Sequence, residues 1–128
     1  MVMIDVLLEA VPERGLSAKT FRGGEYGVWE GLVCETALVE CVAQTTAAFL
    51  GFHRLPAADR ERTGLLVAVS AFVFARRPRV GEPLLIEARL DASFEEMLLV
   101  KGVVFAGSVE GERVAEGELK VYFKNGKI

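Results

Sequence analysis

The sequence predicts a single α+β domain in which an antiparallel sheet wraps around one long helix. Two observations lead to this prediction. The stretch 33–50 is long, rich in alanine and free of glycine and proline, and shorter runs rich in valine, leucine and isoleucine precede and follow it. With 128 residues, 52% of them apolar, the chain is large enough to bury a core without disulfides or metal ions. We therefore expect one domain over 1–128.

Two strands and a loop are expected before the helix. Residues 2–10 are rich in valine, isoleucine and leucine and predict the first strand. Pro12 and Gly15 mark a turn, after which LSAKTFR (16–22) alternates apolar and polar residues as a second strand does. The segment 23–31 contains four glycines and little periodicity. It is expected to be a loop whose backbone can approach a binding site.

The run VCETALVECVAQTTAAFL (33–50) is the predicted helix, with Gly51 as its expected end. Apolar side chains cover most of its circumference, which is typical of a helix buried on all sides. Cys34 and Cys41 lie seven residues apart, about 10 Å along a helix, which is too far for a disulfide. Both cysteines are expected to be small buried apolar residues.

Four strand-like runs follow the helix, over 64–77, 83–92, 97–108 and 113–124. The first is apolar on both faces, so it is expected to be central in the sheet. The order of two strands, one long helix and four strands is typical of the hot-dog fold. One sheet around one helix leaves an apolar edge and face, which predicts a homodimer or a higher oligomer of dimers.

Composition argues against several classes of partner. The chain has 15 basic and 18 acidic residues, so it lacks the positive field that binds nucleic acid. No run approaches the roughly 20 apolar residues of a membrane span, and the N-terminus has no basic region before its apolar part. We expect a cytoplasmic protein without a membrane partner. No cofactor or metal is expected, because the sequence has no glycine-rich phosphate loop, and one histidine with two cysteines does not make a zinc site.

Glu40 and Gln44 are the only strongly polar side chains between Ala37 and Leu50. Their four-residue spacing places them on one face of the helix. A carboxylate buried among apolar residues is able to give or take a proton near neutral pH. Glu40 is therefore the candidate catalytic residue, with Gln44 beside it. The alternative is that Thr36, Glu40 and Gln44 form a solvent-facing stripe without a catalytic role.

The run VECVAQ (39–44) resembles the helix motif of the hot-dog 3-hydroxyacyl-[acyl carrier protein] dehydratases, in which an aliphatic residue and glutamate precede alanine and glutamine. The resemblance is closest to a divergent subgroup found in aryl-polyene and related biosynthetic clusters, where a tryptophan-containing stretch precedes the helix, as VWEG (28–31) does here. FVFARRPRVGEPLLIEARL (72–90) is similar to the family's strand, Arg-Pro, Gly-acidic turn and next strand. The resemblance covers about residues 23–123.

The resemblance implies a substrate that is an acyl thioester of acyl carrier protein or coenzyme A. It gives Glu40 the role of the carboxylate that protonates the leaving β-hydroxyl. Where the family has its catalytic histidine, fourteen residues earlier, this chain has Tyr26, and where the family has a glycine, five residues earlier, it has Glu35. The backbone N–H of Glu35 can still bind a carbonyl oxygen. Tyr26 or Glu25 is a candidate substitute for the missing base, and the alternative is that both only shape the loop.

Other candidate residues flank this site. Trp29 is expected to seal the acyl tunnel or the dimer interface. Arg76 and Arg77, with Arg79, cluster at a strand end, where they could meet the phosphate of a phosphopantetheine arm or the acidic surface of a carrier protein. A solvated strand end is the alternative. The single histidine, His53, is expected past the helix end, roughly 20 Å along the axis from the carboxylate, and therefore outside the site.

Three functions follow from these observations. The first is a dehydratase-like protein that acts on 3-hydroxyacyl thioesters in fatty-acid- or polyene-type biosynthesis. The second is an acyl thioesterase that uses Glu40 alone, with donors at the helix N-terminus for the oxyanion. The third is a non-catalytic acyl-binding subunit that lacks the family histidine, including one that forms a heterodimer with another hot-dog chain.

Overall fold

The computed structural model describes residues 3–54, 65–95, 97–108 and 110–123. Strands β1 (Val6–Val11) and β2 (Arg14–Thr20) come first, followed by the short strands β3 (Val28–Trp29) and β4 (Leu32–Val33) and the helix α1 (Glu35–Arg54). Four long strands follow, β5 (Leu65–Phe74), β6 (Pro83–Ser93), β7 (Met97–Ala106) and β8 (Glu112–Phe123). The predicted order of elements is confirmed, and a small β3–β4 hairpin is added inside the loop segment.

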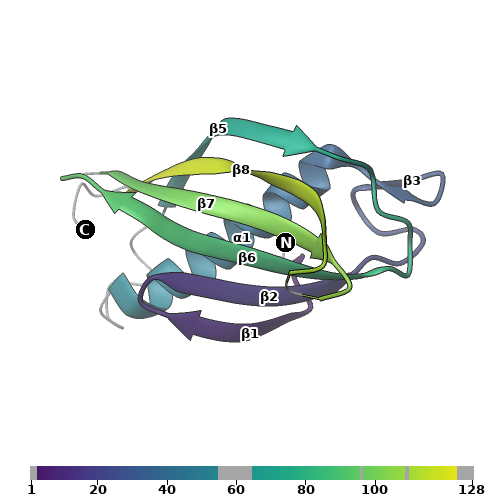
Figure 1. The fold of residues 1–128 in the computed structure, drawn as a ribbon, viewed down its shortest axis with the longest axis horizontal. Coiled ribbons are helices and arrows are strands. Elements are labelled where there is room, and N and C mark those ends of the chain that lie inside the picture. Colours follow the sequence, from purple (N-terminus) through teal and green to yellow (C-terminus); the bar gives the residue numbers. More distant parts are fainter. Residues whose placement is uncertain (1–2, 55–64, 96, 109, 124–128) are drawn as a thin grey trace.

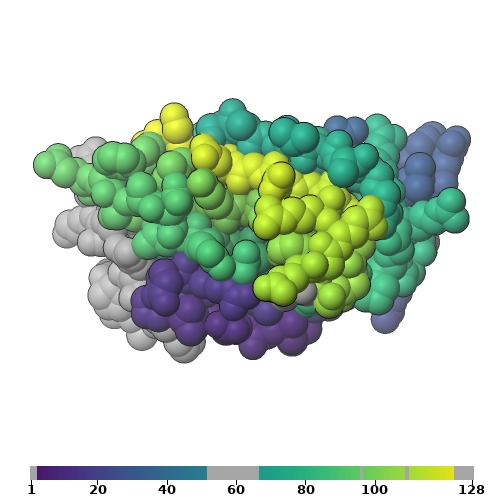
Figure 2. All heavy atoms as spheres, in the orientation of Figure 1, coloured from purple at the N-terminus to yellow at the C-terminus, as the bar shows by residue number. Residues whose placement is uncertain are grey.

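The six long strands form one antiparallel sheet in the order β1-β2-β6-β7-β8-β5. Figure 1 shows the sheet curling across α1, with β1 and β5 at its opposite edges. Figure 2 shows the outer face of the sheet in the same orientation, where the strands hide most of the helix. The predicted α+β architecture, an antiparallel sheet around one long helix, is confirmed.

The prediction that the strand after the helix is central in the sheet is wrong for the single chain. β5 is an edge strand, bonded only to β8 among the described strands. Its two apolar faces have different neighbours, because Phe72 and Phe74 pack against the core while Val69 and Val73 are exposed. A strand with an apolar exposed face has the same sequence pattern as a central strand, so periodicity does not distinguish them.

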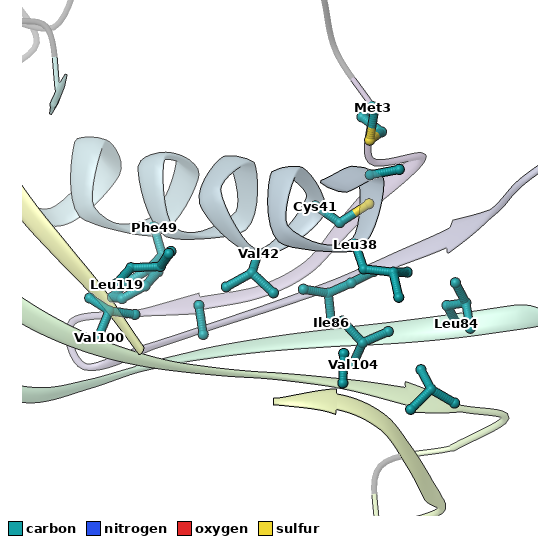
Figure 3. Packing of buried hydrophobic residues seen from close by; sticks show 14 of the residues in the cluster. Met3, Leu38, Cys41, Val42, Phe49, Leu84, Ile86, Val100, Val104 and Leu119 are labelled. Carbon is teal, nitrogen blue, oxygen red and sulfur yellow. The ribbon is translucent and has the colours of Figure 1, made fainter. Parts of the chain in front are cut away.

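The core lies between one side of α1 and the inner face of the sheet. Leu38, Val42 and Phe49 of the helix are fully buried and face strand residues such as Ile86 and Val104 (Figure 3). Burial of such side chains stabilises the fold by about 1.5–3 kcal/mol each.

Two glycines let the helix lie close to the sheet. A Cβ atom at Gly102 would lie 2.3 Å from Cγ1 of Val42, and one at Gly15 would lie 2.8 Å from Cδ1 of Phe49. Neither distance is compatible with a side chain at these positions in the present packing.

The helix differs from its prediction at its end and in its surroundings. It continues through Gly51 to Arg54, so His53 lies in its last turn and not past its end. A single glycine costs a helix only about 1 kcal/mol, less than the burial of one neighbouring leucine contributes. The helix is also not buried on all sides, because the sheet covers one face and leaves Thr36 and Glu40 exposed. The apolar residues Val39 and Ala43 on this open face are only partly covered.

Other properties of the described residues bear on function. No helix among them is both long and apolar enough to cross a membrane. They contain no group of three or more histidine, cysteine and acidic side chains that could hold a metal ion. Both cysteines are free, with Cys41 fully buried and Cys34 partly buried. Burial raises the pKa of the Cys41 thiol to about 12, so this thiol is not a nucleophile near neutral pH.

Candidate functional site

Two pockets open on the side of α1 that the sheet does not cover. The loop pocket has a volume of about 340 Å³ and is lined by Met3, Tyr26, Thr36, Glu40 and Gln44. The β5 pocket has a volume of about 520 Å³ and lies between α1 and β5. Its lining consists of Glu35, Thr36, Val39 and Glu40 from the helix and of residues 69–72 and Phe74 from the strand. Thr36 and Glu40 line both pockets and therefore stand at their boundary.

Gln44 connects the Glu40 carboxylate to the N-terminal segment. Its Nε2 donates to Oε1 of Glu40 at 3.0 Å, one helical turn away. Its Oε1 accepts hydrogen bonds from the backbone N–H groups of Met3, at 2.6 Å, and Ile4, at 3.4 Å. The amide is thus held from both ends, and its orientation determines which oxygen of Glu40 is engaged and which remains open to the pockets.

The expected burial of Glu40 is wrong for the single chain. The residue is exposed, because the sheet packs on the opposite face of α1. The alternative of a solvent-facing stripe of Thr36, Glu40 and Gln44 describes this state better. The stripe is nevertheless bordered by apolar side chains of α1 and β5, so a second molecule lying on this side would desolvate the carboxylate.

The N-terminus of α1 presents unused hydrogen-bond donors beside Glu40. Cys34 N–H donates to the carbonyl of Gly27 at 2.6 Å, and Ala37 N–H donates to the carbonyl of Cys34 at 3.1 Å. Within the described part of the chain, the N–H groups of Glu35 and Thr36 donate to no protein acceptor. Such groups at a helix N-terminus can bind a carbonyl or oxyanion oxygen.

A close contact of the loop with the helix positions this helix end. Gly27 has a φ of 88°, and a Cβ atom there would lie 2.5 Å from Cβ of Ala37. Only glycine combines this backbone conformation with this proximity. The loop can therefore lie directly on the first turn of α1, which brings Tyr26 into the lining of the loop pocket.

Tyr26 and Trp29 are placed differently by the loop. The side chain of Tyr26 is 68% exposed and shares the loop pocket with Glu40. Trp29 is 70% exposed in the β3–β4 hairpin, next to a turn in which Glu30 and Gly31 both have positive φ, and it lines neither of the two pockets. The structure therefore brings Tyr26, but not Trp29, to the carboxylate.

Arg76 is occupied by acidic partners within the chain. Its guanidinium makes two hydrogen bonds of 2.8 Å to Glu82 and two more, of 2.8 and 2.9 Å, to Glu112. The hydrogen bonds from Arg76, together with one from Arg79 N–H, lower the pKa of Glu82 to about 2. Four of the five guanidinium N–H groups are used, so Arg76 holds the turn before β6 against β8. One N–H of Nη1 is left for any other acceptor.

Arg77 lies nearer to the site than Arg76. Its guanidinium pairs with Glu35 at 3.1 Å, and both side chains are about half exposed. Glu35 lines the β5 pocket, so this ion pair stands at the rim of that pocket. An exposed pair of this kind contributes little to stability and can exchange partners when an anionic ligand arrives.

Sequence reasoning missed the β5 side of the site. Phe72 and Phe74, whose ring centroids are 6.0 Å apart, form its apolar wall. Ser70 enters the lining at an irregularity where the register with β8 shifts between Val69 and Ala71. Bulges of this kind reorient a side chain next to functional sites. The alternation of β5 predicted two apolar faces, but no local signal indicated that one of them would face Glu40.

Comparisons with known proteins identify the family and the fold. A model of the family described as ApeP-like (ApeP dehydratase) matches residues 1–127. No match is found among curated protein sequences.

Solved structures with the same fold include the dehydratase heterocomplex ApeI:P from Xenorhabdus doucetiae, at 18% identity and a TM-score of 0.75, covering 94% of this chain and 82% of the other. An Asp-to-Ala mutant of a hypothetical thioesterase from Streptococcus pneumoniae aligns at 9% identity and a TM-score of 0.76, covering 93% and 89%. The protein smu.793 from Streptococcus mutans, bound to acetyl coenzyme A, aligns at 10% identity and a TM-score of 0.73, covering 92% and 86%.

These likenesses establish the hot-dog fold, as the element order predicted. The family match spans nearly the entire length and includes the helix motif around Glu40 and the turn around Arg76. The chain belongs to the ApeP-like dehydratase family.

Proposed function

We propose that this chain acts on 3-hydroxyacyl thioesters in a dehydratase-type reaction, with Glu40 as an acid–base residue. The observation that carries the proposal is the position of Glu40 at the boundary of two pockets. One pocket has an apolar wall suited to an acyl chain, and the other contains the polar groups of Gln44 and Tyr26. Membership in a dehydratase family supports the class of reaction.

Dehydration removes a proton from the α-carbon of the thioester and expels the β-hydroxyl as water. In the proposed geometry, the carboxyl group of Glu40 protonates the leaving hydroxyl, and Gln44 holds one carboxyl oxygen through its 3.0 Å hydrogen bond. The open N–H groups of Glu35 and Thr36 donate hydrogen bonds to the thioester oxygen and stabilise the negative charge that develops on it. The acyl chain lies along the aromatic wall of the β5 pocket, and its carrier is acyl carrier protein or coenzyme A.

The base that takes the α-proton is proposed to come from a partner chain. Among the described residues, α1 contains the one histidine of the sequence, His53, thirteen residues and therefore roughly 20 Å from Glu40 along the axis. Tyr26 lines the loop pocket together with Glu40. A phenol is, however, a poor base near neutral pH unless a neighbouring group activates it. A relative in this fold is itself described as a heterocomplex, which supports a heterodimer with a histidine-bearing hot-dog chain.

The β5 edge is the proposed contact for this partner. Val69 and Val73 are 53% and 69% exposed there, and an unpaired edge strand presents free backbone groups to another chain. A partner on this edge also covers the open face of α1 and completes the β5 pocket. A homodimer through the same edge is the alternative, and in that case Tyr26 remains the candidate second group.

Thioester hydrolysis is the second candidate function. It is favoured by one observation, the open N–H groups of Glu35 and Thr36 next to a carboxylate that is exposed to water. A carboxylate and an oxyanion site suffice for hydrolysis, so this reaction needs no partner histidine.

The test follows enoyl product and free thiol separately, with 3-hydroxyacyl and saturated acyl thioesters of both carriers as substrates. The protein is assayed alone and mixed with a histidine-bearing hot-dog dehydratase. We expect enoyl formation, at least in the mixture, and a decrease of about 10²–10⁴-fold in Glu40→Gln. Glu13→Gln, in the β1–β2 turn, is the matched control and should retain activity. Thiol release without enoyl product would replace the proposal with hydrolysis, and turnover that is independent of Glu40 would refute both.

The proposed interface is tested by Val73→Glu, which places a charge on the β5 edge. We expect sedimentation of the mixture with a histidine-bearing hot-dog dehydratase to show a heterodimer for the unmodified protein and none for this variant. Leu8→Glu is the matched control, because Leu8 is 53% exposed on the opposite edge strand, β1. A dimer that dissociates with Leu8→Glu but not with Val73→Glu would move the interface to β1.

A further inference from the structure

Lys19 is a buried cation on the side of β2 that faces α1. Gly15, Ser17 and Lys19 are the buried alternate residues of β2. Gly15 lies against Phe49 of α1, and Ser17 shares a 2.5 Å hydrogen bond with Thr45 of α1. Such core-facing positions are normally apolar, and on the neighbouring strand β6 they are. Lys19 is only 4% exposed. A lysine buried to this extent requires an explanation.

The ammonium of Lys19 joins two segments that are far apart in the sequence. Nζ donates to Glu25 at 2.7 Å and to Asp5 at 3.3 Å, and it lies 4.8 Å from the ring centroid of Phe21. Each carboxylate also accepts a backbone N–H, from Arg22 for Glu25 and from β2 for Asp5. Burial alone would lower the pKa of Lys19, but the hydrogen bonds to Glu25 and Asp5 outweigh it and raise the pKa. The group is therefore a charged clamp.

Both clamped segments form walls of the loop pocket. Met3 and Tyr26 both line that pocket. Asp5 lies two residues after Met3, and Glu25 lies directly before Tyr26. Across the pocket, Gln44 holds the backbone of the N-terminal segment. One ammonium thus links two segments that form walls of the loop pocket beside the Glu40 carboxylate.

We propose that Lys19 is a positioning residue for the Glu40 site, which sets the width of the loop pocket by clamping the N-terminal segment to the loop that carries Tyr26. The proposal rests on the proposed function for its kinetic consequences, but the clamp itself is a property of the fold. Stability alone does not require this cation, because the side chains of Asp5 and Glu25 are 49% and 36% exposed and water can solvate both carboxylates without it. An apolar side chain cannot, however, hold two carboxylate-bearing segments together.

Lys19→Met tests the clamp by hydrogen exchange and by kinetics. We expect faster amide exchange at residues 3–5 and 22–28, with unchanged exchange in the centre of α1. We also expect KM for the 3-hydroxyacyl thioester to rise about ten- to a hundredfold, as misplaced substrate-binding groups cause, with a smaller change in kcat. Lys19→Arg keeps the charge and should restore part of the protection. Lys101→Met is the control, because Lys101 is 54% exposed and pairs loosely with Asp91 at 3.8 Å.

Variants of the two carboxylates that bind Lys19 test the two segments one at a time. Glu25→Gln should release the loop and leave the N-terminal segment protected, whereas Asp5→Asn should do the reverse. These variants retain Lys19 with one charged partner, so they carry the test if Lys19→Met does not fold.

The outcomes separate the clamp from the proposed reaction. Unchanged exchange in both segments, or faster exchange throughout the protein including α1, would overturn the clamp. If the unmodified protein and its mixture turn over no thioester, the proposed function fails, and the exchange data still decide whether the clamp exists.

Discussion

The two faces of α1 differ in burial, although their residues alternate along the same twenty-residue helix. The sealed face, which includes Leu38, Val42 and Phe49, is fully buried against the sheet. The open face carries Glu40, which lines both pockets, and Gln44, which lines the loop pocket. Most substitutions on the sealed face would create a cavity or a steric clash. On the open face, no layer of the described residues covers Glu40. We therefore expect stability to come from the first face, and we propose that chemistry and partner binding belong to the second.

The largest effect on stability is expected from a cavity on the sealed face. Phe49→Ala should lower the free energy of unfolding by about 3–5 kcal/mol, because the ring is fully buried and its space cannot collapse easily. Urea denaturation followed by circular dichroism measures this change. Phe94→Ala, at a site that is 57% exposed, removes the same ring and should cost far less. Equal losses in the two variants would mean that the helix does not depend on its sealed face.

A smaller loss is expected where the sealed face touches a strand glycine. In Gly102→Ala the new methyl group would meet Val42 at 2.3 Å, and overpacking of this kind costs about 1–3 kcal/mol. The matched variant is Gly51→Ala, in α1, where an added Cβ has no atom within 4 Å. It should stabilise the protein by about 0.5–1 kcal/mol through helix propensity. Thermal unfolding of both variants tests the contrast, and a stabilised Gly102→Ala would contradict the close packing.

A still smaller effect is expected from charges outside the sealed face. Arg76 lowers the pKa of Glu82 to about 2, so the interaction stabilises the fold above the ordinary glutamate pKa of 4.5. It is lost as the pH falls from there toward 2. Solvent screening at this partly exposed pair should limit the contribution to about 1 kcal/mol or less. Glu82→Gln should flatten the dependence of stability on pH in this window, while Glu116→Gln, at an exposed pair with Arg113, should not. Parallel curves for all three proteins would refute the assignment.

The smallest effect on stability is expected on the open face. Glu40→Gln should change the free energy of unfolding by less than about 0.5 kcal/mol, because the side chain is exposed and an amide can still bond to Gln44. Chemical denaturation of the variant that is assayed for activity supplies this number. A loss as large as that of Gly102→Ala would show that Glu40 supports the fold, and a decrease in turnover could then not be assigned to chemistry.

Much of the fold could be predicted, and less of the site. The alanine-rich run indicated α1, and the valine-rich runs indicated the long strands, since local periodicity reports which residues share a face. The spacing of Glu40 and Gln44 predicted their contact, which the structure confirms. Their exposure was predicted wrongly, because an apolar helix surface looks the same whether its own sheet or another chain covers it. The sequence indicated Arg76 as a phosphate ligand, yet Glu82 and Glu112, the second of which lies 36 residues away, occupy four of its five N–H donors.

The sequence by itself determined the order of the elements, the single long helix and the i, i+4 pair that marks the site, because each depends on residues close together in the chain. Only the tertiary structure decided which neighbour each face meets. The run LSAKTFR alternates as a half-buried strand does, but its polar residues Ser17 and Lys19 face the helix and are buried. A buried hydrogen bond from Ser17 to Thr45, and ion pairs from Lys19 to Asp5 and Glu25, stabilise this orientation of the strand. None of these partners belongs to the strand itself, and its alternation does not encode them.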